Sequence, residues 1–175
     1  MINLIWVRWA QMQDDSFAVR FDATTRLRHL LSSSKRANSV MSALGSARLK
    51  QLVLWLESSD DHPKLQHEYL WACAHCTASK NTDLIVEQGA IPVFLRLLRS
   101  PHTHIRERAR CACTSANDYR VEFRDELLAL DALSLVLDFA RNPLSSRIGA
   151  LQHAAWFCAT RSPQPVRASD HRGDA

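Results

Sequence analysis

The sequence predicts an all-α fold built from a repeated helical unit, and three observations support this prediction. The chain of 175 residues holds only four glycines and six prolines, the residues that helix interiors tolerate least. Its apolar residues recur at helical spacing in several stretches. These stretches return after 40 to 45 residues, a period typical of helical repeat arrays. A single unit of this size cannot close a core, so we expect stacked units to form a right-handed helical solenoid.

One helix of the unit is indicated at three places. Gly89 can end a helix, Pro92 suits the first turn of the next one, and apolar residues continue at helical spacing up to Leu98. The segments 49–56 and 133–140 carry the same apolar stripe at about one period before and after. We interpret the three segments as copies of the second helix of a unit.

A proline-containing turn follows each copy, and a third helix follows each turn. The turns span 60–63, 100–102 and 142–145, and the helices that follow are predicted over 66–74, 107–113 and 152–159. Trp71, Cys111 and Trp156 occupy matching positions in these helices, 40 and 45 residues apart. An earlier helix over 18–31 places Leu27 44 residues before Trp71. The chain therefore contains about four three-helix units.

The predicted array occupies residues 1–160. Its units span roughly 4–35, 46–79, 83–117 and 124–160. The serine-rich segment 32–39 is interpreted as an exposed connector. Residues 161–175 contain prolines and almost no apolar side chains, so we expect a disordered tail there.

Composition and charge exclude several classes of protein. No stretch of 18 uninterrupted apolar residues occurs and the amino terminus lacks a basic leader, so we expect neither a membrane span nor secretion. The net charge of +4 and the pI near 9.0 arise from scattered charges, without the basic stripe that nucleic-acid binding requires. Five cysteines, an odd number crowded at helical spacings, indicate reduced thiols in an intracellular protein.

These segments together resemble the armadillo repeats of importin alpha, the adaptor family that reads nuclear localisation signals on cargo and passes the cargo to importin beta. The resemblance runs from 22–32 through 89–92 and 100–102 to Trp156, and 123–125 is similar to a Cys-Arg-Asp found at the same point in the family. It implies an armadillo-repeat solenoid of the cytoplasm and nucleus, with neither catalysis nor a cofactor.

In that family the third helices line a concave groove with a Trp-x-x-x-Asn signature, whose two residues lie one turn apart on one face. Indole rings form slots for signal lysines, and the Asn amides bind the peptide backbone. The resemblance assigns Trp71 and Trp156 to the first and third groove tryptophans. Cys111 stands where the middle one is expected, so one wall of the slots is missing.

The groove positions after each tryptophan also depart from the family. His75, Ser115 and Thr160 occupy the three Asn positions, which weakens the contacts to a peptide backbone. Asp118 lies one position away from the family's acidic residue and is the candidate for selecting a basic side chain. Arg108 replaces a groove Gln and should repel a lysine-rich signal.

The resemblance gives two hypotheses for function. The first is a truncated, divergent adaptor in nuclear protein import that binds basic localisation signals through a weakened groove. The basic segment that binds importin beta is not found, so we do not expect importin beta to bind this chain. The second is an armadillo interaction module outside transport, with a changed peptide preference. An exposed last repeat would also favour self-association.

Three other interpretations of the candidate residues are weaker. Trp71 and Trp156 could simply pack between repeats. Cys73, His75, Cys76 and the Cys111–Cys113 pair contain zinc-ligand types, but Cys111 and Cys113 diverge by about 200° around a helix. A cysteine–histidine nucleophile pair would also need an oxyanion-binding element, which the sequence does not indicate. We therefore expect neither a metal centre nor an enzyme.

Overall fold

The computed structural model describes residues 2–119, 125, 127–132, 134, 135 and 137. Residues 2–119 form seven helices: α1 (Ile2–Gln11), α2 (Phe17–Leu31), α3 (Ser34–Glu57), α4 (Pro63–Thr77), α5 (Thr82–Val86), α6 (Ala90–Leu97) and α7 (Thr103–Tyr119). The predicted all-α fold is confirmed. The helix predicted over 133–140 lies mostly outside the described residues, and those predicted beyond it, with the tail, lie wholly outside.

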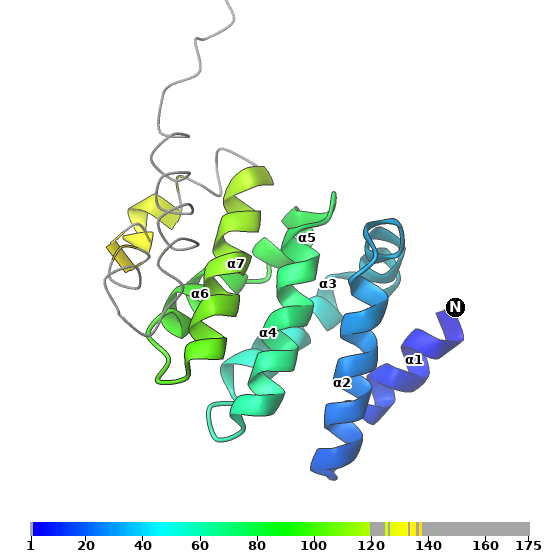
Figure 1. Cartoon of the computed structure of the whole chain (residues 1–175). Helices are drawn as coiled ribbons and strands as arrows, with labels where there is room; N and C mark the ends of the chain where they lie inside the picture. Colours follow the sequence, from blue (N-terminus) through cyan, green and yellow to red (C-terminus); the bar gives the residue numbers. More distant parts are fainter. Residues whose placement is uncertain (1, 120–124, 126, 133, 136, 138–175) are drawn as a thin grey trace, which may run out of the picture.

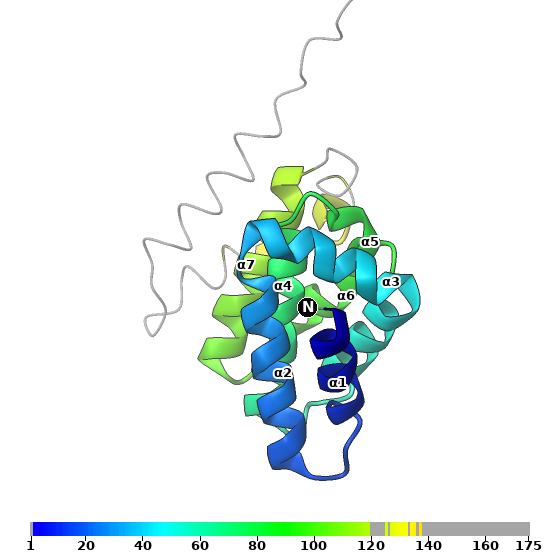
Figure 2. The same ribbon diagram turned by 90° about the vertical axis from the view of Figure 1, so that its right-hand side faces the viewer.

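The helices form two layers. Figure 1 shows α2, α4 and α7 side by side, with α4 in the middle, and Figure 2 shows α1 and α3 on the other side of this row. The most extensive contacts in the molecule join α4 to α7 and to α2. The third helices that the sequence predicts over 66–74 and 107–113, and the early helix over 18–31, lie in this row. The row therefore brings equivalent helices of successive units together.

Two glycines form the corners inside the units. Gly45 interrupts α3 with φ 69° and ψ 170°, and Gly89 separates α5 from α6 with φ 84° and ψ 26°. Residues that carry a side chain rarely adopt a positive φ, whereas glycine does so at little cost. A Cβ built at either position would meet nothing within 4 Å, so backbone conformation, and not crowding, requires glycine here. Gly89 was predicted to end a helix, whereas no such role was predicted for Gly45, its counterpart 44 positions earlier.

One apolar cluster runs through the layers. Its largest fully buried side chains include Phe94, Leu70, Leu56 and Met41. At the α1 end, the ring centroids of Trp9 and Trp55 lie 4.9 Å apart. Continuity between neighbouring units is what a repeat array needs, because no unit buries its apolar surface alone.

The prediction of an exposed connector over residues 32–39 is wrong. Helix α3 begins at Ser34, and Ala37 has only 1% of its surface exposed. Ala37, Val40, Met41 and Leu44 recur at spacings of three and four residues, and all four are buried. Packing of this apolar stripe outweighs the weak helix preference of the serine-rich stretch. Only Ser32 and Ser33 separate α2 from α3.

Candidate peptide-binding face

Side chains from all three helices of the row meet around a tryptophan on the middle helix. Trp71 is half-buried on α4, with Arg28 of α2 on one side and Arg108 of α7 on the other. His67 and His75 lie one turn before and after Trp71 on α4. We call these five residues the Trp71 face. It is built by residues from three successive units, so only the assembled row presents it.

The histidines follow the helical spacing of α4. The ring centroids of His67 and Trp71 lie 5.5 Å apart in an edge-on arrangement, and those of Trp71 and His75 lie 6.3 Å apart, nearly parallel. His67 also meets His104 of α7 with 5.1 Å between the ring centroids. An aromatic row therefore runs along α4 and crosses to α7.

Two guanidinium groups cover the indole of Trp71. The guanidinium carbons of Arg28 and Arg108 lie 4.0 Å and 3.9 Å from the indole centroid. Arg28 comes from α2 and Arg108 from α7, the two helices that flank α4 (Figure 1). Each guanidinium group lies in the position that a cation takes over an aromatic ring. The chain's own arginines therefore occupy the places where the family resemblance would put signal lysines.

Arg28 is held by a buried carboxylate. Its Nε donates to Glu68 Oε2 over 2.6 Å, and both side chains are only about one-tenth exposed, at 11% and 10%. Burial raises the pKa of Glu68, but hydrogen bonds from His67 and Arg28, and the positive charge of Arg28, outweigh this and lower it to about 2. Glu68 is therefore ionised at neutral pH and offsets the charge of Arg28.

Arg108 lacks such a partner among the described side chains. Its Nε is buried without a hydrogen-bond acceptor, and no ion pair joins it to a described acidic residue. Burial and, to a smaller degree, the nearby charge of Arg28 lower the pKa of Arg108, while Cys111, Glu107 and Glu68 act in the opposite direction. An arginine remains protonated in any protein environment, so Arg108 brings an unneutralised charge to the face.

His75 contributes a second polar atom without a partner. Its Nε2 is buried with no hydrogen bond to a described residue. Burial, followed by the charges of Arg108 and Arg28, lowers the pKa of His75 below its usual value of 6.5. The ring is therefore neutral at pH 7, with one nitrogen able to donate and one to accept a hydrogen bond.

The structure describes only some of the remaining predicted site residues. Cys111 and Ser115 lie on α7, both partly exposed, one and two turns after Arg108. Asp118 lies near the carboxyl end of the same helix, and its side chain is outside the described part of the structure. Trp156 and Thr160 lie outside the described residues. The peptide-binding role of all seven residues stays a prediction.

Two residues of the face, Arg28 and His67, were missed by sequence reasoning. The 44-residue spacing pairs Leu27 with Trp71, yet Leu27 is buried, with 1% of its surface exposed, and its neighbour Arg28 reaches the indole. Arg28 carries no motif of its own. Its partner Glu68 lies 40 residues away, which is close to the repeat period, and that spacing is the one signal that could have linked the two.

Three of the described cysteines are buried thiols. Cys73, Cys76 and Cys113 are buried, and burial raises the pKa of Cys76 and Cys113 to about 12 and that of Cys73 well above its usual value. A protonated thiol is a poor nucleophile and a poor metal ligand. In the part of the chain that the structure describes, no three His, Cys, Asp or Glu side chains come together as metal ligands do.

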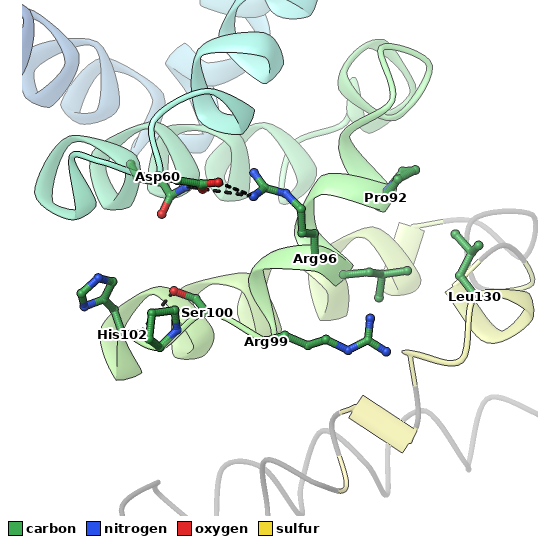
Figure 3. Close-up of a pocket in the computed structure, with 10 residues that line it drawn as sticks. Asp60, Pro92, Arg96, Arg99, Ser100, His102 and Leu130 are labelled. Carbon is green, nitrogen blue, oxygen red and sulfur yellow. Dashed lines mark hydrogen bonds and ion pairs between the residues drawn. The ribbon is translucent and has the colours of Figure 1, made fainter.

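A separate cavity of about 640 Å³ lies beside α6, and Figure 3 shows its lining. It is lined by Asp60, Gln66, Pro92, Leu95, Arg96, Arg99, Ser100, Pro101, His102 and Leu130. Arg96 Nη1 donates to both carboxylate oxygens of Asp60, over 2.8 and 3.0 Å, and Arg96 Nη2 donates to the Glu57 carbonyl over 2.8 Å. We call these contacts the Asp60–Arg96 edge. They join the turn after one second helix to the next second helix.

None of the described helices is long and apolar enough to span a lipid bilayer.

Comparison with known proteins agrees with this architecture. The sequence model of the family described as armadillo/beta-catenin-like repeat matches residues 78–112. Importin subunit alpha-1b of Oryza sativa subsp. japonica is 32% identical over 160 residues, covering 88% of this chain and 29% of that protein. Importin subunit alpha-2 of Arabidopsis thaliana is 30% identical over 171 residues, covering 94% of this chain and 30% of that protein. The chain thus spans about three-tenths of the length of these relatives.

Solved structures show the same fold at lower identity. The designed armadillo repeat protein YIII(Dq)4CqI superposes with a TM-score of 0.76 at 17% identity, covering 90% of this chain and 64% of that one. The designed armadillo repeat protein YIII(Dq.V1)4CPAF, solved in complex with the peptide (KR)4, gives a TM-score of 0.75 at 18% identity, covering 89% of this chain and 63% of that one. The predicted armadillo solenoid is therefore confirmed as the fold.

Proposed function

The chain belongs to the armadillo-repeat proteins as a divergent relative of the importin alpha subunits, and from this premise we propose that it binds linear peptide segments of other proteins along the Trp71 face. One observation carries the proposal. Equivalent helices α2, α4 and α7 lie in a single row, with the partly buried Trp71 on its middle helix and two unpartnered nitrogens on α4 and α7. A row of this kind offers a peptide contacts at each unit.

The similarity to importin alpha subunits supports a role as an adaptor in nuclear protein import, moving between cytoplasm and nucleus. In this role the ligand is a basic localisation signal on a cargo protein. Trp71 and the partly exposed Ser115 are the described groove positions that remain for it, with Asp118 as the acidic candidate. Binding is expected to be weak, because none of the three groove Asn positions carries an amide.

The geometry around Trp71 favours the second candidate, an interaction module whose peptide preference has changed. Arg28 and Arg108 both already stack on the indole, so a lysine would have to displace a cation of the protein. It would also approach unneutralised positive charge at Arg108 in a partly dehydrated site, where like charges repel more strongly than in water. The peptide-binding function is the same in both candidates, and the chemistry of the ligand differs.

Titration of a fluorescent lysine-rich signal peptide against the full chain tests the import role. The matched control for Trp71→Ala is Trp6→Ala, because Trp6 is also half-buried and stacks with an arginine, Arg48, whose guanidinium carbon lies 4.3 Å from the ring centroid. Import-type binding requires a dissociation constant below about 100 μM, equivalent to about 5.5 kcal/mol, and its loss in Trp71→Ala alone. Weaker binding, or equal loss in both variants, contradicts the import role.

A further inference from the structure

The charges of the Trp71 face are unbalanced. Two arginines, Arg28 and Arg108, stack on the indole, and two histidines of α4, His67 and His75, lie beside it. The nearest described carboxylate, Glu68, is buried and already holds Arg28. Glu107 attracts Arg108, but no ion pair joins the two. A face that is positively charged after its internal pairs are counted fits a negatively charged partner.

The unpartnered nitrogens have the chemistry that recognises a carboxylate. Arg108 Nε is a buried donor without an acceptor, and a buried donor left unsatisfied is costly. A guanidinium donates two parallel hydrogen bonds to a carboxylate, a geometry that a single amide cannot match. His75 Nε2, also buried and unpartnered, lies on the neighbouring helix and belongs to a ring close enough for Arg108 to lower its pKa. The two residues therefore present polar groups from neighbouring helices, His75 from α4 and Arg108 from α7.

We propose that the Trp71 face binds an acidic peptide segment, with an Asp or Glu carboxylate of that segment paired to Arg108 and hydrogen-bonded to His75. The proposal rests on the peptide-binding function and names its ligand class. Trp71 then serves as an apolar platform that fixes the two guanidinium groups, and it is not a slot for lysine. Arg28 stays with Glu68 and adds long-range attraction.

A peptide fits this face better than a nucleic acid does. Binding a phosphate backbone uses many lysines and arginines along a track, because each neutralised phosphate adds to affinity. The Trp71 face contains two arginines, one of them already paired, and a histidine, His75, that is neutral at pH 7. A few carboxylates spaced along an extended chain match this limited charge.

Three labelled decapeptides test the proposal, identical except at four central positions that carry Glu, Gln or Lys. Fluorescence anisotropy with the full chain should show the Glu peptide binding at least about tenfold more tightly than either of the others. Arg108→Gln, which introduces the residue that the family resemblance predicts there, should weaken the Glu peptide by about tenfold. The matched control Arg99→Gln removes an exposed arginine at the α6 cavity and should change its affinity by less than about twofold.

Each result separates this proposal from the function on which it rests. A Lys peptide that binds more tightly, with loss in Trp71→Ala, overturns the acidic ligand and keeps the peptide-binding face. If none of the three peptides binds, both proposals fall. An oligothymidine that binds as tightly as the Glu peptide, and equally depends on Arg108, overturns the assignment to a peptide. Thermal unfolding checks that each variant is folded, and Arg108→Lys, which keeps the charge but loses the paired donors, should give an intermediate affinity.

Discussion

The Asp60–Arg96 edge and the Trp71 face both place an arginine between neighbouring units. Arg96 at the edge is paired with a carboxylate, whereas Arg108 on the face is not. At the edge, Arg96 donates to a carboxylate and to the Glu57 carbonyl. On the face, Arg108 stacks on an aromatic ring and keeps a buried nitrogen without an acceptor. An arginine whose donors are used inside the fold connects units, whereas Arg108, which no ion pair joins to a described acidic residue, keeps its charge for a partner. This difference is the reason that we propose the Trp71 face as the binding surface.

Arg28 belongs with Arg96 in this comparison, although it lies on the Trp71 face. Its charge is taken up by Glu68 inside the fold. The Trp71 indole therefore carries one arginine that is ion-paired inside the fold, Arg28, and one that is not, Arg108. Substitutions at Glu68, the partner of Arg28, and at Arg108 should show which arginine stabilises the fold.

The largest effect is expected at Glu68. Glu68→Gln leaves Arg28 nearly buried without a counter-charge and should lower the free energy of unfolding by about 2–3 kcal/mol. Urea denaturation at pH 7 measures the change. Glu87→Gln, an exposed carboxylate at the end of α5, is the charge-matched control and should stay within about 0.5 kcal/mol. A small effect at Glu68 would show that Arg28 is as weakly held as Arg108.

The same pair gives a pH dependence with a defined sign. The folded protein lowers the Glu68 pKa from 4.5 to about 2, so the folded state holds this proton less tightly than the unfolded chain. The stabilisation is therefore complete above pH 4.5 and is lost as the pH falls towards 2. The difference between wild type and Glu68→Gln should shrink over this window. A difference that stays constant down to pH 3 would contradict the assigned pairing.

A smaller effect distinguishes Arg96 of the Asp60–Arg96 edge from Arg108 of the Trp71 face. Arg96→Gln should lower the free energy of unfolding by about 0.5–1 kcal/mol, because the Asp60 pair is largely exposed and screened by solvent. Arg108→Gln should cost nothing or stabilise slightly, since it removes a partly buried, unneutralised charge. Parallel urea titrations of both variants measure this. Equal destabilisation would mean that Arg108 is also a structural contact.

The smallest effect concerns His75. Its folded pKa is lowered, so the unfolded chain takes up a proton first as the pH falls below 6.5. Stability should therefore decline between pH 7 and pH 5, and His75→Asn should reduce that decline. Unfolding free energies of both proteins at the two pH values test this. An identical decline in the variant would remove His75 from the charged environment that we describe.

The predicted and observed folds agree where the signal is periodic and apolar. The helices around Leu70 and Phe94 carry apolar side chains at regular helical spacing, and both were placed correctly. The serine-rich start of α3 was misjudged, because its helical state depends on packing of Ala37 and Val40 that local composition does not reveal. Gly45 was missed for a related reason: its role is a backbone angle, and the sequence around it shows no helix end.

The site was predictable in its location and only partly in its chemistry. The repeat spacing placed Trp71 on the row of third helices, and the resemblance indicated that Arg108 would oppose lysine. The stacking of Arg28 on the same indole could not be predicted, since it requires the relative placement of α2 and α4. The state of Arg108 Nε and His75 Nε2 depends on burial, which no local pattern encodes.

The different accessibility of the thiols gives the molecule a built-in labelling position. Among the described cysteines, Cys73, Cys76 and Cys113 are enclosed by the apolar cluster, whereas Cys111 is partly exposed on α7, one turn from Arg108. In a Cys158→Ser background, a maleimide dye should therefore attach to Cys111 first. A fluorophore there would lie beside the proposed Trp71 face and would report binding at that face optically, without a tag on the ligand itself.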